Sequence, residues 1–365
     1  MFNPNFSLFM LAVIMLPVSS PCYGQDVNSL KLKDYRPVSI YKNPATEIKK
    51  AKYPAIDVHS HDNNNTDVDK LVKLMDECGI EKKIILSYAT GTRFDSIVAK
   101  YARYKDRFDI WCGFDYTGFD TPGWEKHAVK ELERCHEKGA KGVGELGDKG
   151  LGEFYSLPVA GWGLHIDDPQ MKRLFEKCAD LKMPVNVHVA EDEWMYLPAD
   201  SANDGLMNAA KWKVDLSKKG ILDHDQLIAT LENAVRDNPK TLFIACHLAN
   251  CCANLNMLAV LLDKYPNLYA DLAARFGEFS PVPRYAARFM EKYQDRLLYG
   301  IDTDGSSANY EREMYKITFR ILETGDEHFY NHDLFDYHWP LYGLSLSNKA
   351  LEKIYSGNIK KLMQH

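Results

Sequence analysis

The apolar positions of this chain fall into short runs that alternate with longer amphipathic stretches. Short apolar runs are typical of parallel strands that are buried on both faces, whereas the longer stretches carry apolar residues at helical spacing. The alternation predicts strands at residues 55–62, 83–88, 108–114, 141–146, 185–189, 242–247, 268–272 and 297–302. It predicts helices at residues 67–78, 94–104, 125–138, 169–181, 223–236, 255–264, 284–293 and 311–323.

Eight alternating strands and helices are typical of one (β/α)8 TIM barrel, an α/β fold of about 250 residues. No linker or change of composition divides this part of the chain. We therefore predict one domain at residues 54–365, in which a helical C-terminal appendage around residues 349–362 follows the barrel. Residues 25–53 form a polar N-terminal lead-in to that domain.

The first 24 residues differ from the rest of the chain. An apolar run at residues 6–18 is followed by small and polar residues, and it is shorter than the about 20 residues that span a bilayer. We interpret residues 1–24 as a secretory signal peptide that is cleaved after Gly24, so the protein would be periplasmic or secreted. A lipid anchor at Cys22 is a less favoured alternative, because Pro21 directly precedes it.

Composition and charge exclude several classes of protein. The chain is 45% hydrophobic and 26% charged, as in ordinary soluble domains. A net charge of -6 without any basic run argues against nucleic-acid binding, and no later apolar stretch is long enough to span a membrane. Seven cysteines follow Gly24, and their odd number and spacing match no disulfide framework. We predict that they are mostly core thiols.

The first predicted strand contains a candidate metal-binding motif, AIDVHSHD at residues 55–62. Alternate side chains of a strand share one face, so Asp57, His59 and His61 should point the same way. Imidazole is the commonest side-chain metal ligand. A single H-x-H pair is equally compatible with ordinary strand residues, so the interpretation depends on what the other strands carry.

The ends of later strands add further ligand-type side chains. TIM barrels build their sites at the C-terminal ends of the strands, where the prediction places Glu145, His188, His247 and Asp302. Taken alone, either acid could cap a helix. Carboxylates and imidazoles that gather without partners are costly to bury, and a divalent cation supplies that partner. The sequence therefore predicts a metal site made of His59, His61, Glu145, His188, His247 and Asp302.

The substrate is a small molecule about which the sequence says less. The fourth and fifth strand–helix units are longer than the average of about 31 residues, and the excess lies in the loops after their strands, which carry Trp162, His165 and Trp194. These side chains could wall a pocket or simply anchor the loops. Arg93 and Arg275 follow two other strands, and each could clamp a substrate carboxylate or form an ordinary surface ion pair.

Several stretches together resemble the amidohydrolase-related (amidohydrolase-2) branch of the metal-dependent hydrolase superfamily. They are AIDVHSH, VHVAE, ACHLAN, RLLYGIDTD and ALEKIYSGNIKKL, which occur between residues 54 and 362. The resemblance implies one or two divalent ions, zinc being the expected metal. It also implies that His59, His61, His188 and Asp302 hold metal, and that His247 is a ligand or an acid–base partner.

That branch contains hydrolases, lactonases and non-oxidative decarboxylases of the aminocarboxymuconate-semialdehyde type. The stretch GVGELG around Glu145 resembles the strand of deoxyribonuclease-type members in which a Glu bridges two metals, an acid that the mononuclear decarboxylases do not need. We therefore expect a hydrolase that uses a metal-activated water on an amide, lactone or ester bond, with Asp302 and His247 as its catalytic residues and Asp302 as general base. A mononuclear decarboxylase is the alternative, and a catalytically inactive exported binding protein is a weaker one. The oligomeric state is left open, with a homodimer as one option.

Overall fold

The structure is a computed structural model that describes residues 26–209, 213–335 and 337–364. The predicted signal peptide and Cys22 lie outside the described residues. The chain divides into two compact units, Met1–Tyr35 and Arg36–His365. In the first, the described residues form a short 3-10 helix at Leu32–Asp34. The second begins earlier than residue 54, because Thr46 and Lys52 donate backbone hydrogen bonds to Asp326 and Glu323.

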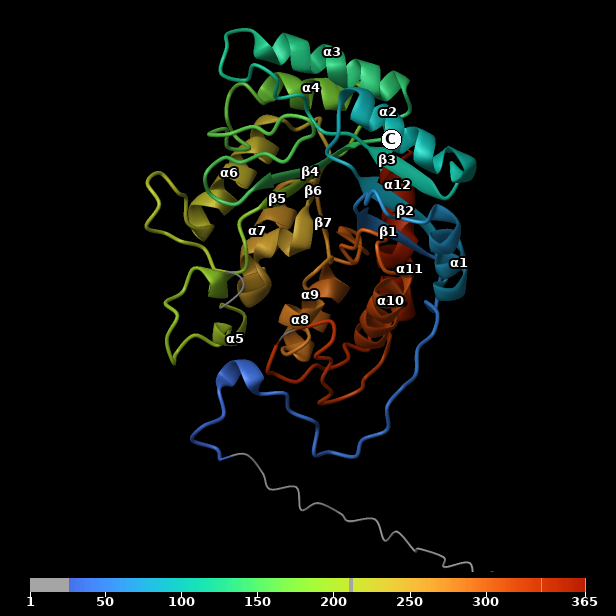
Figure 1. Ribbon diagram of the computed structural model, residues 1–365, viewed down its shortest axis with the longest axis vertical. Helices are drawn as coiled ribbons and strands as arrows, with labels where there is room; N and C mark the ends of the chain where they lie inside the picture. The colour runs from blue at the N-terminus through green and yellow to red at the C-terminus, as the bar shows by residue number, and fades with distance from the viewer. Residues whose placement is uncertain (1–25, 210–212, 336, 365) are drawn as a thin grey trace, which may run out of the picture. The chain divides into compact units, whose positions relative to one another are not determined.

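The described residues of the second unit form eight parallel strands (Figure 1). These strands are β1 (Ala55–Ser60), β2 (Ile80–Leu86), β3 (Phe108–Trp111), β4 (Val143–Asp148), β5 (Val185–Val189), β6 (Phe243–Ala245), β7 (Leu268–Asp271) and β8 (Leu297–Leu298). Continuous pairing joins β1 to β3 and β4 to β8. Parallel bridges between Cys112 and Val143 and between Ser60 and Thr303 join the two series at both ends. The predicted TIM barrel is therefore confirmed.

Helices surround the strands in the order that the sequence predicts (Figure 1). They are α1 (Val68–Cys78), α2 (Gly91–Tyr101), α3 (Trp124–Glu137), α4 (Lys172–Asp180), α6 (His224–Asp237), α7 (Leu255–Lys264), α9 (Pro283–Lys292) and α10 (Ala308–Glu323). Two short helices that we did not predict, α5 (Leu206–Ala209) and α8 (Phe276–Phe279), lie in loops that follow β5 and β7. The C-terminal appendage is helical as predicted, with α11 (Asn348–Glu352), a π-helical turn at Lys353–Gly357 and α12 (Asn358–Leu362).

Local signals explain where the helices begin. The Asp67 side chain caps α1 by accepting a hydrogen bond from the backbone of Lys70, and Gly79 ends that helix with a left-handed φ of 77°. A capping box formed by Asp223 and Gln226 starts α6. These caps fix the helix ends, and so the loops that carry the site leave the barrel at defined points.

Most of the predicted strand ends at the mouth of the barrel differ from the structure by one to four residues, and three of these differences concern the site. We predicted strands at residues 242–247 and 297–302, but β6 ends at Ala245 and β8 at Leu298, and His247 (φ 59°) and Asp302 (φ 60°) lie after these ends in left-handed backbone conformations. Such a φ turns the chain out of the extended conformation. In contrast, β4 continues to Asp148, so Glu145 lies inside the strand rather than near its end.

A buried polar network fixes the seam between β1 and the segment after β8. Lys83 Nζ lies 3.4 Å from Asp57 Oδ2 and forms a closer ion pair with Glu311, while Tyr315 donates a hydrogen bond of 2.7 Å to Asp57. Buried charges are tolerated when each has a partner. Across the same seam the Asp302 backbone N–H donates to His59 O at 2.9 Å. The network therefore holds β1 beside Asp302.

The seven cysteines that follow Gly24 are all buried and free, as predicted. Among the described residues, no helix has the length and apolar character needed to cross a membrane.

Candidate metal centre

The six predicted ligand residues meet at the mouth of the barrel, and Glu145 lies at their middle. Its Oε2 atom is 3.9 Å from His59 Nε2 and 3.5 Å from His61 Nε2. Its Oε1 atom is 2.6 Å from His188 Nδ1 and 3.5 Å from His247 Nε2. One carboxylate therefore separates two pairs of imidazoles, with one oxygen facing each pair.

Asp302 completes the centre on the side of the first pair. Its Oδ1 atom lies 3.1 Å from His61 Nε2 and 3.6 Å from His59 Nε2, and its Oδ2 atom lies 3.9 Å from His247 Nε2. The side chain is 28% exposed, whereas that of Glu145 is 7% exposed and that of His59 is fully buried. Asp302 is therefore the group of the centre that solvent or a substrate reaches most easily.

In each of these imidazoles, the ring nitrogen that faces away from the centre is hydrogen-bonded to a group outside the centre. Nδ1 of His61 lies 3.0 Å from Leu86 O, and Nδ1 of His247 lies 2.9 Å from Ala273 O. A carbonyl oxygen only accepts, so each Nδ1 carries the proton and each Nε2 is left as a possible metal ligand. By the same argument His188 donates from Nε2 to Ala190 O at 3.0 Å and presents Nδ1 to the centre.

His59 is oriented by a carboxylate instead of a carbonyl. Its Nδ1 lies 3.0 Å from Asp271 Oδ2, the arrangement that commonly supports a metal-binding histidine. Its Nε2 is buried and has no hydrogen-bond partner among the described residues. An unpaired buried nitrogen is costly, and a divalent cation would satisfy it.

The donor set fits a divalent ion, and the two groups of atoms that are close enough to share one both include His59, whereas neither includes His188. Atoms close enough to share an ion occur on His59, His61 and Asp302, and also on His59, Glu145, Cys246 and His247. Imidazole nitrogens and carboxylate oxygens suit zinc and manganese. Cys246 is already engaged, since its Sγ donates to Asn186 Oδ1 at 2.8 Å. Burial also raises the pKa of that thiol well above its usual value.

The same imidazoles bind protons tightly when no metal competes. Burial by itself would lower the pKa of His59, but the carboxylates of Asp271 and Asp302 outweigh it and raise that pKa to about 10. Nearby carboxylates raise the pKa of His61 and of His188 for the same reason, despite burial. A metal must therefore displace protons from these nitrogens.

We expect metal affinity to rise with pH between about 6 and 9, because protons leave nitrogens whose pKa values are raised above the usual 6.5. Each displaced proton should strengthen binding by about tenfold per pH unit. Chelator competition across this range would measure the slope, and calorimetry in buffers of different ionisation enthalpy would count the protons released. An affinity that is independent of pH would contradict this assignment of protons.

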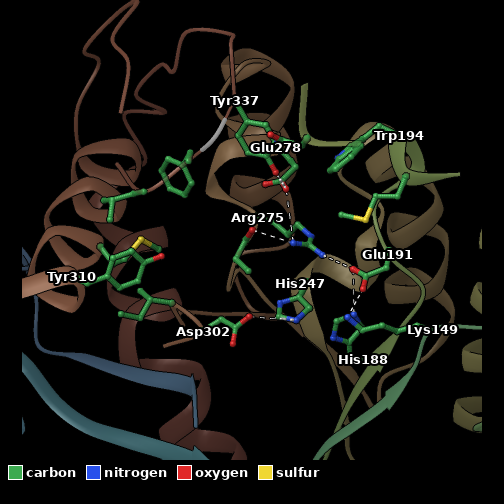
Figure 2. Close-up of a pocket in the computed structure, with 17 residues that line it drawn as sticks. Lys149, His188, Glu191, Trp194, His247, Arg275, Glu278, Asp302, Tyr310 and Tyr337 are labelled. Atoms are coloured by element: carbon green, nitrogen blue, oxygen red, sulfur yellow. Dashed lines mark hydrogen bonds and ion pairs between the residues drawn. The ribbon is translucent and has the colours of Figure 1, made fainter. Parts of the chain in front are cut away.

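A cavity of about 310 Å³ opens above the centre, and His188, His247 and Asp302 form part of its floor (Figure 2). Lys149 and Glu191 line it from the loops after β4 and β5. Asp302 and Tyr310 also line a second cavity, of about 540 Å³, which lies beside His61. The long loops therefore contribute to the face where a substrate would bind, as their length predicts.

Arg275 lies deep in the cavity wall between three carboxylates (Figure 2). Its Nε atom is 2.9 Å from both Asp192 Oδ2 and Asn250 Oδ1, and its Nη2 atom is 3.5 Å from Glu191 Oε2. Its Nη1 atom donates to a backbone carbonyl and faces Glu278 at 3.8 Å. Arg275 is only 7% exposed. It is neither a surface ion pair nor a free clamp for a substrate.

The remaining predicted substrate residues are placed as follows. Trp194 lines the cavity. Trp162 is 58% exposed and is not part of the cavity lining. His165 Nδ1 pairs with Asp148 Oδ2 at 2.8 Å, and Arg93 donates to Asn64 at 2.8 Å and faces Asp62 at 3.4 Å. The structure therefore brings Trp194 to the cavity, leaves Trp162 largely exposed, and engages His165 and Arg93 in contacts outside the cavity lining.

Sequence reasoning missed Asp271 and the cavity residues Lys149, Glu191 and Glu278. Asp271 could have been found, because it is a lone acid at the end of the buried strand β7. Glu191 stands in the VHVAE stretch, but nothing in its spacing shows that it faces Arg275 and Lys149. Those contacts arise only when loops from different units meet.

Comparison with known proteins shows which family this chain belongs to. Residues 42–363 match the family model described as Amidohydrolase. No curated protein matches the chain. Similar solved structures include a dihydroxybenzoic acid decarboxylase from Polaromonas sp. JS666 with bound manganese and the inhibitor 2-nitroresorcinol. It has a TM-score of 0.53 and 15% identity over 86% of this chain and 97% of the other. A putative amidohydrolase from Staphylococcus aureus has a TM-score of 0.52 and 15% identity over 85% and 99%.

Proposed function

Because the chain belongs to the amidohydrolase family whose model it matches over residues 42–363, we propose that it is a metal-dependent hydrolase. Its substrate would be a small organic molecule with an amide, lactone or ester bond. The observation that carries the proposal is the position of Glu145, whose two oxygens face two separate pairs of histidines. That arrangement suits a carboxylate that bridges two ions.

The ligands divide into two sets that share Glu145. His59, His61 and Asp302 would hold one ion together with Glu145 Oε2, and His188 and His247 would hold the other with Glu145 Oε1. Zinc is the ion we propose for both positions. When bound, such an ion supplies a Lewis acid and lowers the pKa of water from 15.7 to about 7.

Asp302 is suited to move the proton of the attacking water. When no metal is bound, burial raises the pKa of its carboxyl, but His59 and His61 outweigh burial and hold that pKa well below its usual range, so the group is ionised. The ionised carboxylate lies at the floor of the cavity. It would accept a proton from water and return it to the leaving group.

His247 is better suited to bind metal than to polarise a carbonyl. Its Nδ1 proton is donated to Ala273 O, and burial lowers the pKa of the ring, so Nε2 carries no proton in the neutral form. A ring nitrogen without a proton can accept but cannot donate to a substrate oxygen. We expected His247 to be a metal ligand or an acid–base partner, and the hydrogen bond to Ala273 favours the ligand.

A mononuclear decarboxylase is a second candidate, supported by similar solved structures. One is the manganese-bound dihydroxybenzoic acid decarboxylase already mentioned, and another is 5-carboxyvanillate decarboxylase from Novosphingobium aromaticivorans, at a TM-score of 0.50 and 14% identity. In that case the same residues would hold one ion and Glu145 would only orient His188. Identity this low supports the fold and does not carry the activity.

Metal counting separates the two candidates. We expect the wild-type protein to hold nearly two equivalents of zinc and Glu145→Gln to hold about one, because the amide has lost the charge and one ligand oxygen. Glu153→Gln, an acid on the loop after the same strand, is the matched control and should keep both ions. A wild type that saturates at one equivalent, with Glu145→Gln unchanged, would favour the decarboxylase. Release of carbon dioxide from an aromatic acid would then identify it.

We also propose that the protein is exported, because residues 1–24 have the composition of a secretory leader. N-terminal sequencing of the protein recovered from the periplasm or the medium should find a chain that begins at Gln25.

A further inference from the structure

Two buried carboxyl groups, those of Asp192 and Glu278, lie beside Arg275 in the wall of the cavity. Glu278 belongs to α8 and lines the cavity between Arg275 and Tyr337 (Figure 2), and Asp192 belongs to the loop after β5. Arg275 Nε is 2.9 Å from Asp192 Oδ2, and Arg275 Nη1 is 3.8 Å from Glu278 Oε1. The side chains of Asp192 and Glu278 are 3% and 6% exposed, so little water reaches this acid pair.

Three of the four oxygens of the acid pair have no hydrogen-bond donor. Both carboxyl oxygens of Asp192 and Oε2 of Glu278 are buried without a partner among the described residues. Arg275 Nε has one hydrogen and donates it to Asn250 Oδ1, and the Tyr337 hydroxyl donates to Glu278 Oε1. Two ionised carboxylates only accept, so neither can satisfy the other. A single proton on the pair supplies the missing donor and relieves a costly arrangement.

The charges around the acid pair also balance only with one proton. The cluster consists of two cations, Lys149 and Arg275, and three acids, Glu191, Asp192 and Glu278. Three ionised acids would leave one uncompensated negative charge among buried groups, which is costly. With one proton on the pair, two negative charges face two positive charges.

The neighbours of Glu278 act on its proton in the same sense. Burial raises the pKa of its carboxyl well above the usual value, and the charge of Asp192 raises it further, against smaller opposing effects of Arg275 and Tyr337. The Cys252 thiol faces both acids, and burial raises its pKa too, so it stays neutral. Burial likewise keeps the Tyr337 phenol protonated by raising its pKa. The remaining neighbours therefore add no charge that would remove the proton.

The acid pair connects parts of the chain that are distant in sequence. Asp192 belongs to the loop after β5, Glu278 to α8, and Tyr337 to the segment after α10. Tyr337 packs closely on Gly277, since a Cβ at that position would overlap its ring. Trp339 stacks on Tyr337 with ring centroids 4.4 Å apart and donates from Nε1 to Gly277 O at 2.9 Å. The pair is therefore placed to fix one wall of the cavity.

We propose that Asp192 and Glu278 share one proton at neutral pH, and that this proton fastens α8 to the loop after β5 as a pH-sensitive clasp in the cavity wall. When the proton leaves to a solvent base at alkaline pH, two adjacent buried carboxylates repel each other. Contacts between α8 and the loop should then loosen. The clasp does not depend on which reaction the metal centre performs.

Infrared difference spectroscopy tests for the proton directly. The spectrum of zinc-loaded wild type minus that of Glu278→Gln at neutral pH should contain the C=O stretch of a protonated carboxylic acid. Glutamine keeps a donor for Asp192 and an acceptor for Tyr337 but cannot ionise. Glu313→Gln is the control, because Glu313 is 55% exposed and pairs with Lys316, and its difference spectrum should lack that band. Absence of the band from the Glu278→Gln difference would overturn the shared proton.

Unfolding measurements test the consequence for stability. The unfolded chain releases the Glu278 proton near pH 4.3, whereas the folded chain keeps it to higher pH, so stability is lost as pH rises between the two pKa values. Relative to Glu278→Gln, the folding equilibrium constant of the wild type should fall by up to about tenfold per pH unit. Urea unfolding between about pH 5 and 8, at one zinc concentration, measures this difference. Parallel pH profiles of the two proteins would overturn the proposal.

Hydrogen exchange locates the loosening. Protection of the backbone amides in residues 192–196 and 276–280, corrected for the intrinsic exchange rate, should fall in the wild type at the pH where the infrared band disappears. In Glu278→Gln the protection should not change with pH. If that variant does not fold, Asp192→Asn replaces it, since it too leaves one acid beside an amide donor. Protection that is constant in the wild type, or that falls equally in the variant, would contradict the clasp.

Discussion

Replacing both His59 and His61 with alanine should strip the protein of metal and leave the barrel folded. The two imidazoles supply adjacent ligands, and His59 Nε2 faces both Glu145 and Asp302. Changes in outer contacts alone typically cost about 10- to 100-fold in metal affinity, so loss of two ligands should cost on the order of 10³-fold or more. Turnover should fall below detection for the same reason.

The fold should survive because Asp271, the buried partner of His59, keeps other donors. The backbone N–H groups of His247 and Ala273 donate to its Oδ1 at 2.9 and 3.1 Å, and Asn186 donates to its Oδ2 at 3.3 Å. Asp271 is therefore not left as a buried carboxylate without a partner, which would be a usual cause of large destabilisation.

Elemental analysis after dialysis, with circular dichroism on the same samples, measures both parts of this prediction. The matched control replaces His127 and His165, which pair with Asp115 and Asp148 away from the centre, and it should retain full metal. Stoichiometric metal in a folded His59→Ala/His61→Ala protein would show that the centre lies elsewhere.

The fold and the convergence of the six candidate ligand residues could be predicted because both follow from local spacing. Each strand–helix unit carries its own periodicity, and an H-x-H pair places two rings on one face whatever surrounds it. That Glu145 meets the other candidates could also be predicted, since the C-terminal halves of the strands of one barrel converge on one mouth, although Glu145 lies inside β4 and not near its end. These inferences need only the order of the units.

The features that the sequence did not predict depend on contacts between strand–helix units that are distant in sequence. His247 and Asp302 adopt left-handed φ values that non-glycine residues rarely take, because their backbone N–H groups donate to Asp271 and to His59 O. No sequence pattern in β6 or β8 indicates those hydrogen-bond partners. For the same reason the sequence left Arg275 open as a clamp for a substrate carboxylate or a surface ion pair, whereas three acids and Asn250 surround its donors.

Substituting Asp302 by asparagine should separate proton transfer from metal binding. Asn keeps the size and one ligand oxygen but cannot accept the proton of water, and positioned general bases typically contribute 10²–10⁴-fold. We expect turnover to fall by roughly that factor once a substrate is identified. Metal content should fall much less than in the His59 and His61 pair, because the other ligands remain.

Asp304 provides a control two residues away. Its Oδ2 accepts a hydrogen bond from Asn63 at 2.8 Å and its Oδ1 accepts one from the Ser306 backbone at 2.9 Å, while Ser307 is the residue that caps α10. Asp304 thus stabilises a turn and makes no contact with the histidines of the centre. Asp304→Asn should cost about 1 kcal/mol or less in stability and leave most of the activity. An inactive Asp304→Asn beside an active Asp302→Asn, measured as kcat and as metal content, would mean that the neighbouring acid is the base.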